Sequence, residues 1–265
     1  MKQQENGRSS EYSRLTIDEV REAGRKIVSI LGLTTFPVGV HFVADDLLPA
    51  GALRLESHRY CQALMLARQG QTVVLDGEGI SCPAAAAAFG FYPLPEGLRS
   101  GKGLVGFGIV SDPAVGRRMF EDMPCLEAGR IHHLELFPLE QADSIPHVVV
   151  VEGEVEKLMW LVLGYLHATG GQRVTAHTAV LQATCVDATL IPFLESRLNF
   201  GFGCYGCRDA TDLADGESIV GFPVSFLAPI VTHLEYLNAN AIPTSRGKKA
   251  WHALGKKHGR RKSSP

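Results

Sequence analysis

The residues of this sequence most able to do chemistry are cysteines, and two of them stand together in Cys204-Tyr205-Gly206-Cys207. Two thiolates at this spacing can bind one metal ion, because the turn between them brings both sulfurs to the same side. Gly206 can take the positive φ that lets a loop wrap around an ion. A redox dithiol would need a helix start here, whereas the glycine-containing stretch Ser196–Cys207 predicts a loop.

The other cysteines are single and scattered. Cys185 precedes the pair, and Cys61 and Cys82 lie in the first half of the chain. Zinc sites and iron–sulfur clusters usually take four ligands, and a fold can assemble them from distant segments. Structural zinc usually uses two paired knuckles, so one short pair with single cysteines favours a cluster. Buried cysteines can also be small hydrophobes, which is our expectation for Cys125 beside Pro124.

Composition limits where these thiols act. The chain has 265 residues, six cysteines, 45% hydrophobic and 20% charged residues and a net charge of −2. Its first residues lack the apolar core of a secretory signal. The longest apolar run, Leu158–Leu166, is shorter than the roughly 20 residues of a membrane span. We therefore expect a cytoplasmic protein with reduced thiols, without a membrane or nucleic-acid partner.

Several regular elements should position the cysteines. A capping box at Thr16 and Glu19 predicts a helix that Gly32 ends. A strand is expected over 37–43, a helix over 59–68 that carries Cys61, and a short strand over 72–75. Cys82-Pro83 should open a helix that ends near Gly90, which would place the Cys82 thiol where the helix dipole favours thiolate.

The second half repeats the order of strand and helix. The β-branched run His147–Val151 predicts a buried strand, and Glu154–His167 predicts a helix. We therefore expect an α/β fold, a mixed α+β sandwich whose strand order the sequence does not give. The domain limits we expect are a disordered N-terminus (1–14), one cysteine-bearing domain (15–243) and a basic, flexible tail (244–265).

Two other motifs carry less weight. Gly101-Lys102-Gly103-Leu104-Val105-Gly106 has the G-x-G-x-x-G pattern of dinucleotide-binding loops, which requires a strand before it and a helix after it. Residues 92–108 instead predict a loop, followed by a strand over 107–110 and a short helix over 113–123. The adjacent His132 and His133 are expected at the surface.

Taken together, these cysteine segments resemble an uncharacterised prokaryotic family, domain-of-unknown-function family 169, over about residues 38–237. The segments are Arg59-Tyr60-Cys61-Gln62-Ala63, Ala67-Arg68, Cys82-Pro83, Cys185 and Cys204-Tyr205-Gly206-Cys207-Arg208. The resemblance implies a ligand set of Cys61, Cys82, Cys185 and Cys204, with a C-x-G-x-R core at Cys204–Arg208. Cys207 falls at a variable position of that core. No activity follows from the resemblance.

The resulting hypothesis is an iron–sulfur protein, with a 4Fe–4S cluster on those four cysteines, acting in redox or sulfur-transfer chemistry on a small molecule or with a redox partner protein. Cys207 and Arg208 are the expected catalytic residues, Arg208 because its planar guanidinium can hold a carboxylate or phosphate. An ordinary salt bridge or helix contact is the alternative for Arg208. The alternative function is a non-catalytic accessory or binding protein with structural zinc or reduced thiols only. A Cys204–Cys207 redox pair is a third option.

Overall fold

Seven strands form one mixed sheet in the order β2-β3-β4-β1-β5-β7-β6. The computed structural model describes residues 15–245, so the predicted disordered terminus and nearly all of the basic tail lie outside the described residues. The β2–β3 pair is parallel and the other pairs are antiparallel, which confirms the α/β prediction. The strands are β1 (Val38–Val43), β2 (Leu53–Arg54), β3 (Val73–Asp76), β4 (His133–Pro138), β5 (Val148–Glu154), β6 (Asn199–Gly201) and β7 (Glu217–Pro223).

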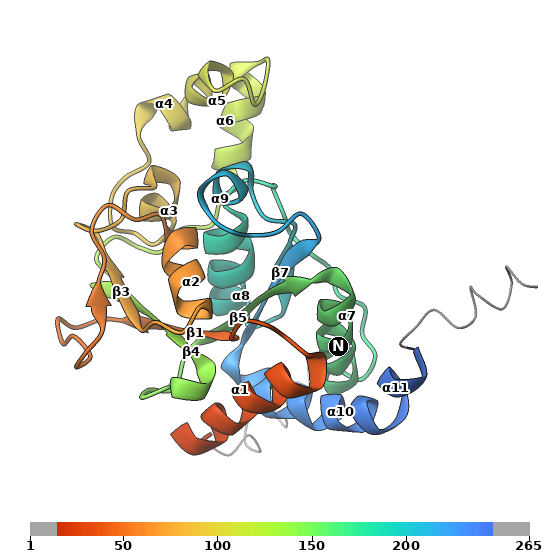
Figure 1. The fold of residues 1–265 in the computed structure, drawn as a ribbon. Coiled ribbons are helices and arrows are strands. Elements are labelled where there is room, and N and C mark those ends of the chain that lie inside the picture. Colours follow the sequence, from red (N-terminus) through yellow and green to blue (C-terminus); the bar gives the residue numbers. More distant parts are fainter. Residues whose placement is uncertain (1–14, 246–265) are drawn as a thin grey trace, which may run out of the picture.

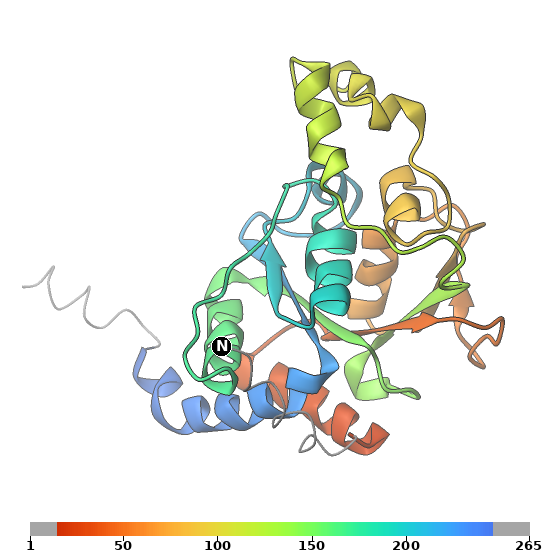
Figure 2. The ribbon, with the colours of Figure 1, turned by 180° about the vertical axis from the view of Figure 1, so that it is seen from behind.

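Both faces of the sheet are covered by helices (Figures 1 and 2). Along β5, Val148 and Val150 belong to one buried core and Val149 and Val151 to the other. A strand buried on both faces needs apolar residues at every position, because successive side chains point to opposite faces. This is why the β-branched run beginning at His147 predicted a buried strand correctly.

One face of the sheet, called here the apolar face, is covered by three long helices: α1 (Ile17–Leu31), α7 (Val155–Ala168) and α10 (Leu227–Asn240). The predicted capping box of α1 is present at Thr16 and Glu19, and Gly32 ends the helix at φ 63°. The short elements η1 (Leu139–Gln141), η3 (Val224–Phe226) and α11 (Ile242–Ser245) accompany these helices. Within residues 15–245, no helix has the length and apolar character needed to cross a bilayer.

The opposite face, called here the cysteine face, is covered by short helices. These are α2 (Tyr60–Arg68), α3 (Pro83–Ala88), the π-helix η2 (Ala183–Leu190), α8 (Ile191–Glu195) and α9 (Tyr205–Ala210). The helix predicted at Cys82-Pro83 is confirmed, with Cys82 as its N-cap residue. π-Helices are rare and tend to occur at functional sites, so η2 directs attention to this face.

A lobe of three short helices projects beyond the cysteine face (Figure 1). It comprises α4 (Glu96–Arg99), α5 (Lys102–Gly106) and α6 (Pro113–Glu121). The prediction of a loop over 92–108 was therefore wrong, as was a strand over 107–110. Leu104, Phe120 and Leu181 form a small core with Ala84, and this tertiary burial stabilises helices too short to form alone. The glycine-rich motif does not lie between a strand and a helix.

The π-helix lies in direct contact with the sheet. Gly221 of β7 faces the backbone of Ala188, and a Cβ at position 221 would overlap the Ala188 carbonyl oxygen. Glycine is therefore required here by the close approach of two backbones. The buried side chain of Asn199 donates from Nδ2 to the Asp187 carbonyl at 2.8 Å, which fixes η2 to the start of β6.

Candidate functional site

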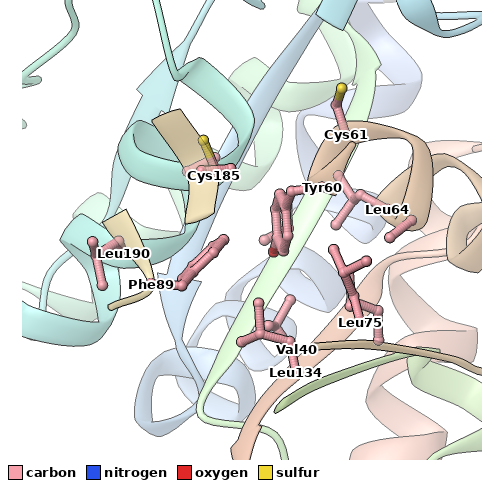
Figure 3. Close-up of a cluster of buried hydrophobic side chains, with 14 of the residues drawn as sticks. Val40, Tyr60, Cys61, Leu64, Leu75, Phe89, Leu134, Cys185 and Leu190 are labelled. Atoms are coloured by element: carbon pink, nitrogen blue, oxygen red, sulfur yellow. The ribbon is translucent and has the colours of Figure 1, made fainter. Parts of the chain in front are cut away.

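Four cysteines from four separate segments meet on the cysteine face. Each lies at a helix N-terminus: Cys82 and Cys204 are the N-cap residues of α3 and α9, and Cys61 and Cys185 lie in the first turns of α2 and η2. Figure 3 shows the sulfurs of Cys61 and Cys185 on the side of the buried cluster away from Val40. The positive ends of four helices therefore meet around these thiols, an arrangement that stabilises negative charge.

Two of these thiols, Cys61 and Cys185, lie near enough to the other cysteines for their ionisation to be affected. Burial raises the pKa of Cys61 to about 12, and the sulfurs of Cys204 and Cys82 add to this rise. Burial also raises the pKa of Cys185, with further contributions from Cys82, Cys204 and Cys61. Like charges in one site disfavour each other, so these sulfurs need a cation or a metal group if all four are to be thiolates.

Cys204 differs from the others. The S–H of Cys207 and the backbone N–H groups of Cys207, Ala183 and Gly206 donate to its sulfur, and these bonds lower its pKa to about 6 despite burial. The Cys207 N–H lies 3.2 Å from the Cys204 sulfur. The thiol of Cys207 has a raised pKa, because it donates to Cys204 and is buried. Cys204 is therefore the more acidic of the two thiols.

The local structure around Cys204 was not predicted correctly. The expected loop over 196–207 contains β6 and ends at α9, which starts at Tyr205 with Cys204 as N-cap and Cys207 in its first turn. Two cysteines exchanging backbone hydrogen bonds take the place of the Ser/Thr and Glu of a usual capping box. The helix start that a redox dithiol requires is therefore present.

Hydrogen bonds join the cysteine-bearing helices to one another. The Arg59 guanidinium, at the N-cap of α2, donates to the Gly206 carbonyl at 2.9 Å, and Gln62 Nε2 donates to the Ala210 carbonyl at 3.2 Å. Tyr60 Oη lies 2.9 Å from Thr189 Oγ1 of η2. Because these bonds connect α2 with both α9 and η2, the positions of Cys61, Cys185 and Cys204 are fixed relative to one another.

Two polar residues of η2 were missed in the sequence. Thr184 Oγ1 is buried and has no hydrogen-bond partner among the described residues, although it lies close enough to Cys207 to affect its pKa. A buried hydroxyl whose one neighbour of this kind is the Cys207 thiol could also donate to a bound group that accepts hydrogen bonds. Burial raises the pKa of the Asp187 carboxyl to about 7. No α-helical spacing of apolar residues is present in Thr184-Cys185-Val186-Asp187, because a π-helix does not follow the 3.6-residue period.

The four thiols are the donor atoms available to a metal group on this face. Within residues 15–245, no three His, Cys, Asp or Glu side chains are grouped to hold one metal ion. Tetrahedral zinc draws each sulfur to about 2.3 Å from the metal, which requires a compact group of ligands. A cluster of several iron and sulfide atoms accepts ligands spread farther apart. In number and softness the four thiols match the ligands of an iron–sulfur cluster.

Arg208 makes contacts of a structural kind. Its Nε donates to the Phe202 carbonyl at 3.0 Å, Nη1 to Ala214 at 3.0 Å and Nη2 to Glu217 at 2.8 Å. All three nitrogens thus bind backbone carbonyls on both sides of α9. This geometry matches the alternative of a helix contact more closely than a guanidinium free to hold a substrate.

Two expectations about single residues were wrong. Cys125 was expected to be buried, yet it is exposed, with its thiol 3.5 Å from the Met123 carbonyl. His133 was expected at the surface, yet it is 3% exposed. His133 begins β4 and lies on the same strand face as Glu135. Glu135 Oε2 is 3.2 Å from His41 Nδ1. His132 is half-exposed beside Asp46, as expected.

Comparison with known proteins places these cysteines in a family. A family model described as domain of unknown function 169, uncharacterised ArCR, matches residues 26–233, which contain all six cysteines. An uncharacterized protein of Methanocaldococcus jannaschii is 28% identical over 226 residues, or 84% of this chain and 96% of that protein. No solved structure matches the chain. Neither description names an activity, so function must be argued from the site.

Proposed function

The chain belongs to domain-of-unknown-function family 169, and we propose that it holds an iron–sulfur cluster on Cys61, Cys82, Cys185 and Cys204. The observation that supports this most strongly is that Cys61 and Cys185 each lie close enough to Cys82 and Cys204 for those sulfurs to raise their pKa values. Four thiols from four segments are an unusual grouping in a core that could have been filled with aliphatic residues. When bound, such a cluster transfers single electrons, which suits redox or sulfur-transfer chemistry on a small molecule.

The residues around the thiols have separate roles in this proposal. The helix N-termini and the N–H groups of Ala183, Gly206 and Cys207 keep Cys204 ionised for ligation. Thr184 supplies a hydroxyl donor toward the bound group. Cys207 keeps its proton beside Cys204 and can exchange it with a substrate, whereas Arg208 holds the segments that flank α9.

The test is an absorption spectrum of anaerobically purified protein, with iron, acid-labile sulfide and zinc assayed on the same sample. We expect a brown protein with comparable iron and sulfide. Serine at any of positions 61, 82, 185 or 204 should remove most of the colour, whereas Cys125→Ser, at an exposed cysteine, should not. A colourless protein with stoichiometric zinc would contradict the proposal and favour the accessory function instead.

A second candidate function rests on the α9 helix start. An ionised Cys204 beside a protonated Cys207 is the arrangement of a reactive dithiol. The Cys204 thiolate and the Cys207 thiol could form a disulfide by exchange with a disulfide substrate, which takes up the two electrons and the one proton of Cys207 and leaves as one thiol and one thiolate. Iodoacetamide should then alkylate Cys204 rapidly above about pH 6 in protein free of metal, and Cys204→Ser should abolish this. Fast alkylation together with no iron after reconstitution would favour the dithiol over the cluster.

A further inference from the structure

A cavity of about 1000 Å³ lies between the lobe and the cysteine face. Helix α6 contributes Val115 and Met119, the π-helix contributes Val186 and Asp187, and the segment 169–182 closes one side with Thr178. This segment, called here the strap, runs without regular structure from α7 to η2 (Figure 2). The volume matches that of small-molecule sites, which are mostly apolar with a few placed polar groups.

The strap is a fixed wall because buried polar groups hold it. Asn199, which is 0% exposed, accepts from the His177 N–H at 2.9 Å and donates to the His177 carbonyl at 2.8 Å. Arg197 Nη1 donates to the Thr175 carbonyl at 2.7 Å. A buried amide that satisfies both backbone groups of one strap residue holds that residue in one position. The cavity is therefore part of the folded structure.

Of the three carboxylates that line the cavity within the described residues, two form ion pairs with an arginine and one does not. Asp122 pairs with Arg118 at 3.0 Å, and Glu195 pairs with Arg197 at 2.6 Å. Asp187 is 3% exposed, and its carboxylate accepts from the neutral Thr178 hydroxyl at 2.7 Å. In the part of the chain that the structure describes, no Lys, Arg or His lies within ion-pair distance of Asp187. Burial without a cation favours the neutral form of this carboxyl, and a bound cation would stabilise the ionised form.

We propose that this cavity binds an organic amine. Its ammonium group lies against the Asp187 carboxylate, and its apolar body packs on Val115, Met119 and Val186. Methionine adapts to ligands of different shape, and Asp187 disfavours carboxylates and phosphates by like charge. The site extends the proposed function without depending on it, because no cysteine lines the cavity and binding requires no cluster.

Three probes with the same aromatic body test this proposal on the full-length protein by isothermal titration calorimetry at pH 7.5. They are 1-naphthylmethylamine, neutral 1-naphthalenemethanol and the anion 1-naphthaleneacetate. The amine should bind about tenfold or more tightly than the anion. Asp187→Asn should weaken the amine by a similar factor and leave the alcohol unchanged. Glu156→Gln, at an exposed residue of α7, is the matched control and should change nothing.

A second variant keeps the test decisive if Asp187→Asn does not fold. Val115 is 51% exposed and lines the cavity, so Val115→Trp can fill the space without disturbing a core, and it should weaken both the amine and the alcohol. Equal or tighter binding of the anion, no binding of the amine, or unchanged amine affinity in both variants would overturn the proposal. Colourless protein that selects the amine would overturn the cluster alone, and brown protein without amine selectivity would overturn the amine site alone.

Discussion

The two faces of the sheet are built from different kinds of helix. On the apolar face, α1, α7 and α10 have 15, 14 and 14 residues. On the cysteine face, α2, α3 and α9 have nine, six and six, and the π-helix has eight. Because every helix begins with N–H groups that lack helical partners, a layer of many short helices collects donors that one long helix would not supply.

The buried side chains differ in the same way. The core of the apolar face contains aliphatic and aromatic residues, whereas the cysteine face also buries the Tyr60–Thr189 hydrogen bond and the Arg68–Glu152 ion pair. Polar groups of this kind contribute little net stability but fix geometry. The difference teaches that both faces bury a hydrophobic core, and that the cysteine face adds buried polar groups that fix the geometry of its helices.

The largest expected effect is on the apolar face. Phe222 of β7 is fully buried in that core, so Phe222→Ala should lower the free energy of unfolding by about 3–5 kcal/mol, measured by chemical denaturation. The control is Tyr236→Ala at an exposed residue of α10, which should change stability by less than about 0.5 kcal/mol. Iron content per folded molecule should stay unchanged in both. Loss of iron in Phe222→Ala without loss of stability would contradict the separation of the two faces into a stabilising core and a thiol site.

A smaller effect depends on pH. Burial raises the pKa of Glu152 from 4.5 to about 7, against the opposing effect of Arg68. A carboxyl with a raised pKa in the folded state contributes stability that is complete below about pH 4.5 and is lost as pH rises through about 7. Wild-type stability relative to Glu152→Gln should therefore fall by on the order of 2 kcal/mol between pH 5 and pH 8.

Urea unfolding at several pH values measures this difference. Glu156→Gln, at an exposed residue on α7, should show no pH-dependent difference from wild type. A constant difference between wild type and Glu152→Gln across this range would show that Arg68, with Glu217 3.2 Å away on its other side, keeps Glu152 ionised throughout. The cysteine face would then contain a permanent ion pair.

The smallest expected effect concerns the bond between α2 and η2. Tyr60→Phe removes the donor to Thr189 Oγ1, whose own hydroxyl still donates to the Thr184 carbonyl, so about 1 kcal/mol of stability should be lost. Tyr205→Phe, at an exposed tyrosine, should cost nothing measurable. Both proteins should keep their colour. A Tyr60→Phe variant as stable as wild type would show that apolar packing alone holds the π-helix.

Local patterns predicted the elements whose stability is local. The capping box at Thr16, the proline after Cys82 and the β-branched run at His147 each act through neighbouring residues, and the expected helix or strand formed in each case. The helices at Glu96 and Lys102 could not be predicted, because their stability depends on Leu104 packing with residues distant in sequence. The approach of Cys61 to Cys185 likewise depends on the chain's path, which spacing along the sequence does not give.

Gly221 limits how this protein can vary. Any side chain there would push the Ala188 backbone away, and the displacement would pass along one rigid π-helix to Cys185 on one surface and Asp187 on another. The thiol site and the cavity therefore both depend on how the π-helix packs on β7. Laboratory evolution for a new ligand should find accepted changes on α6, whose lining residues belong to the lobe, and should reject nearly every change at position 221.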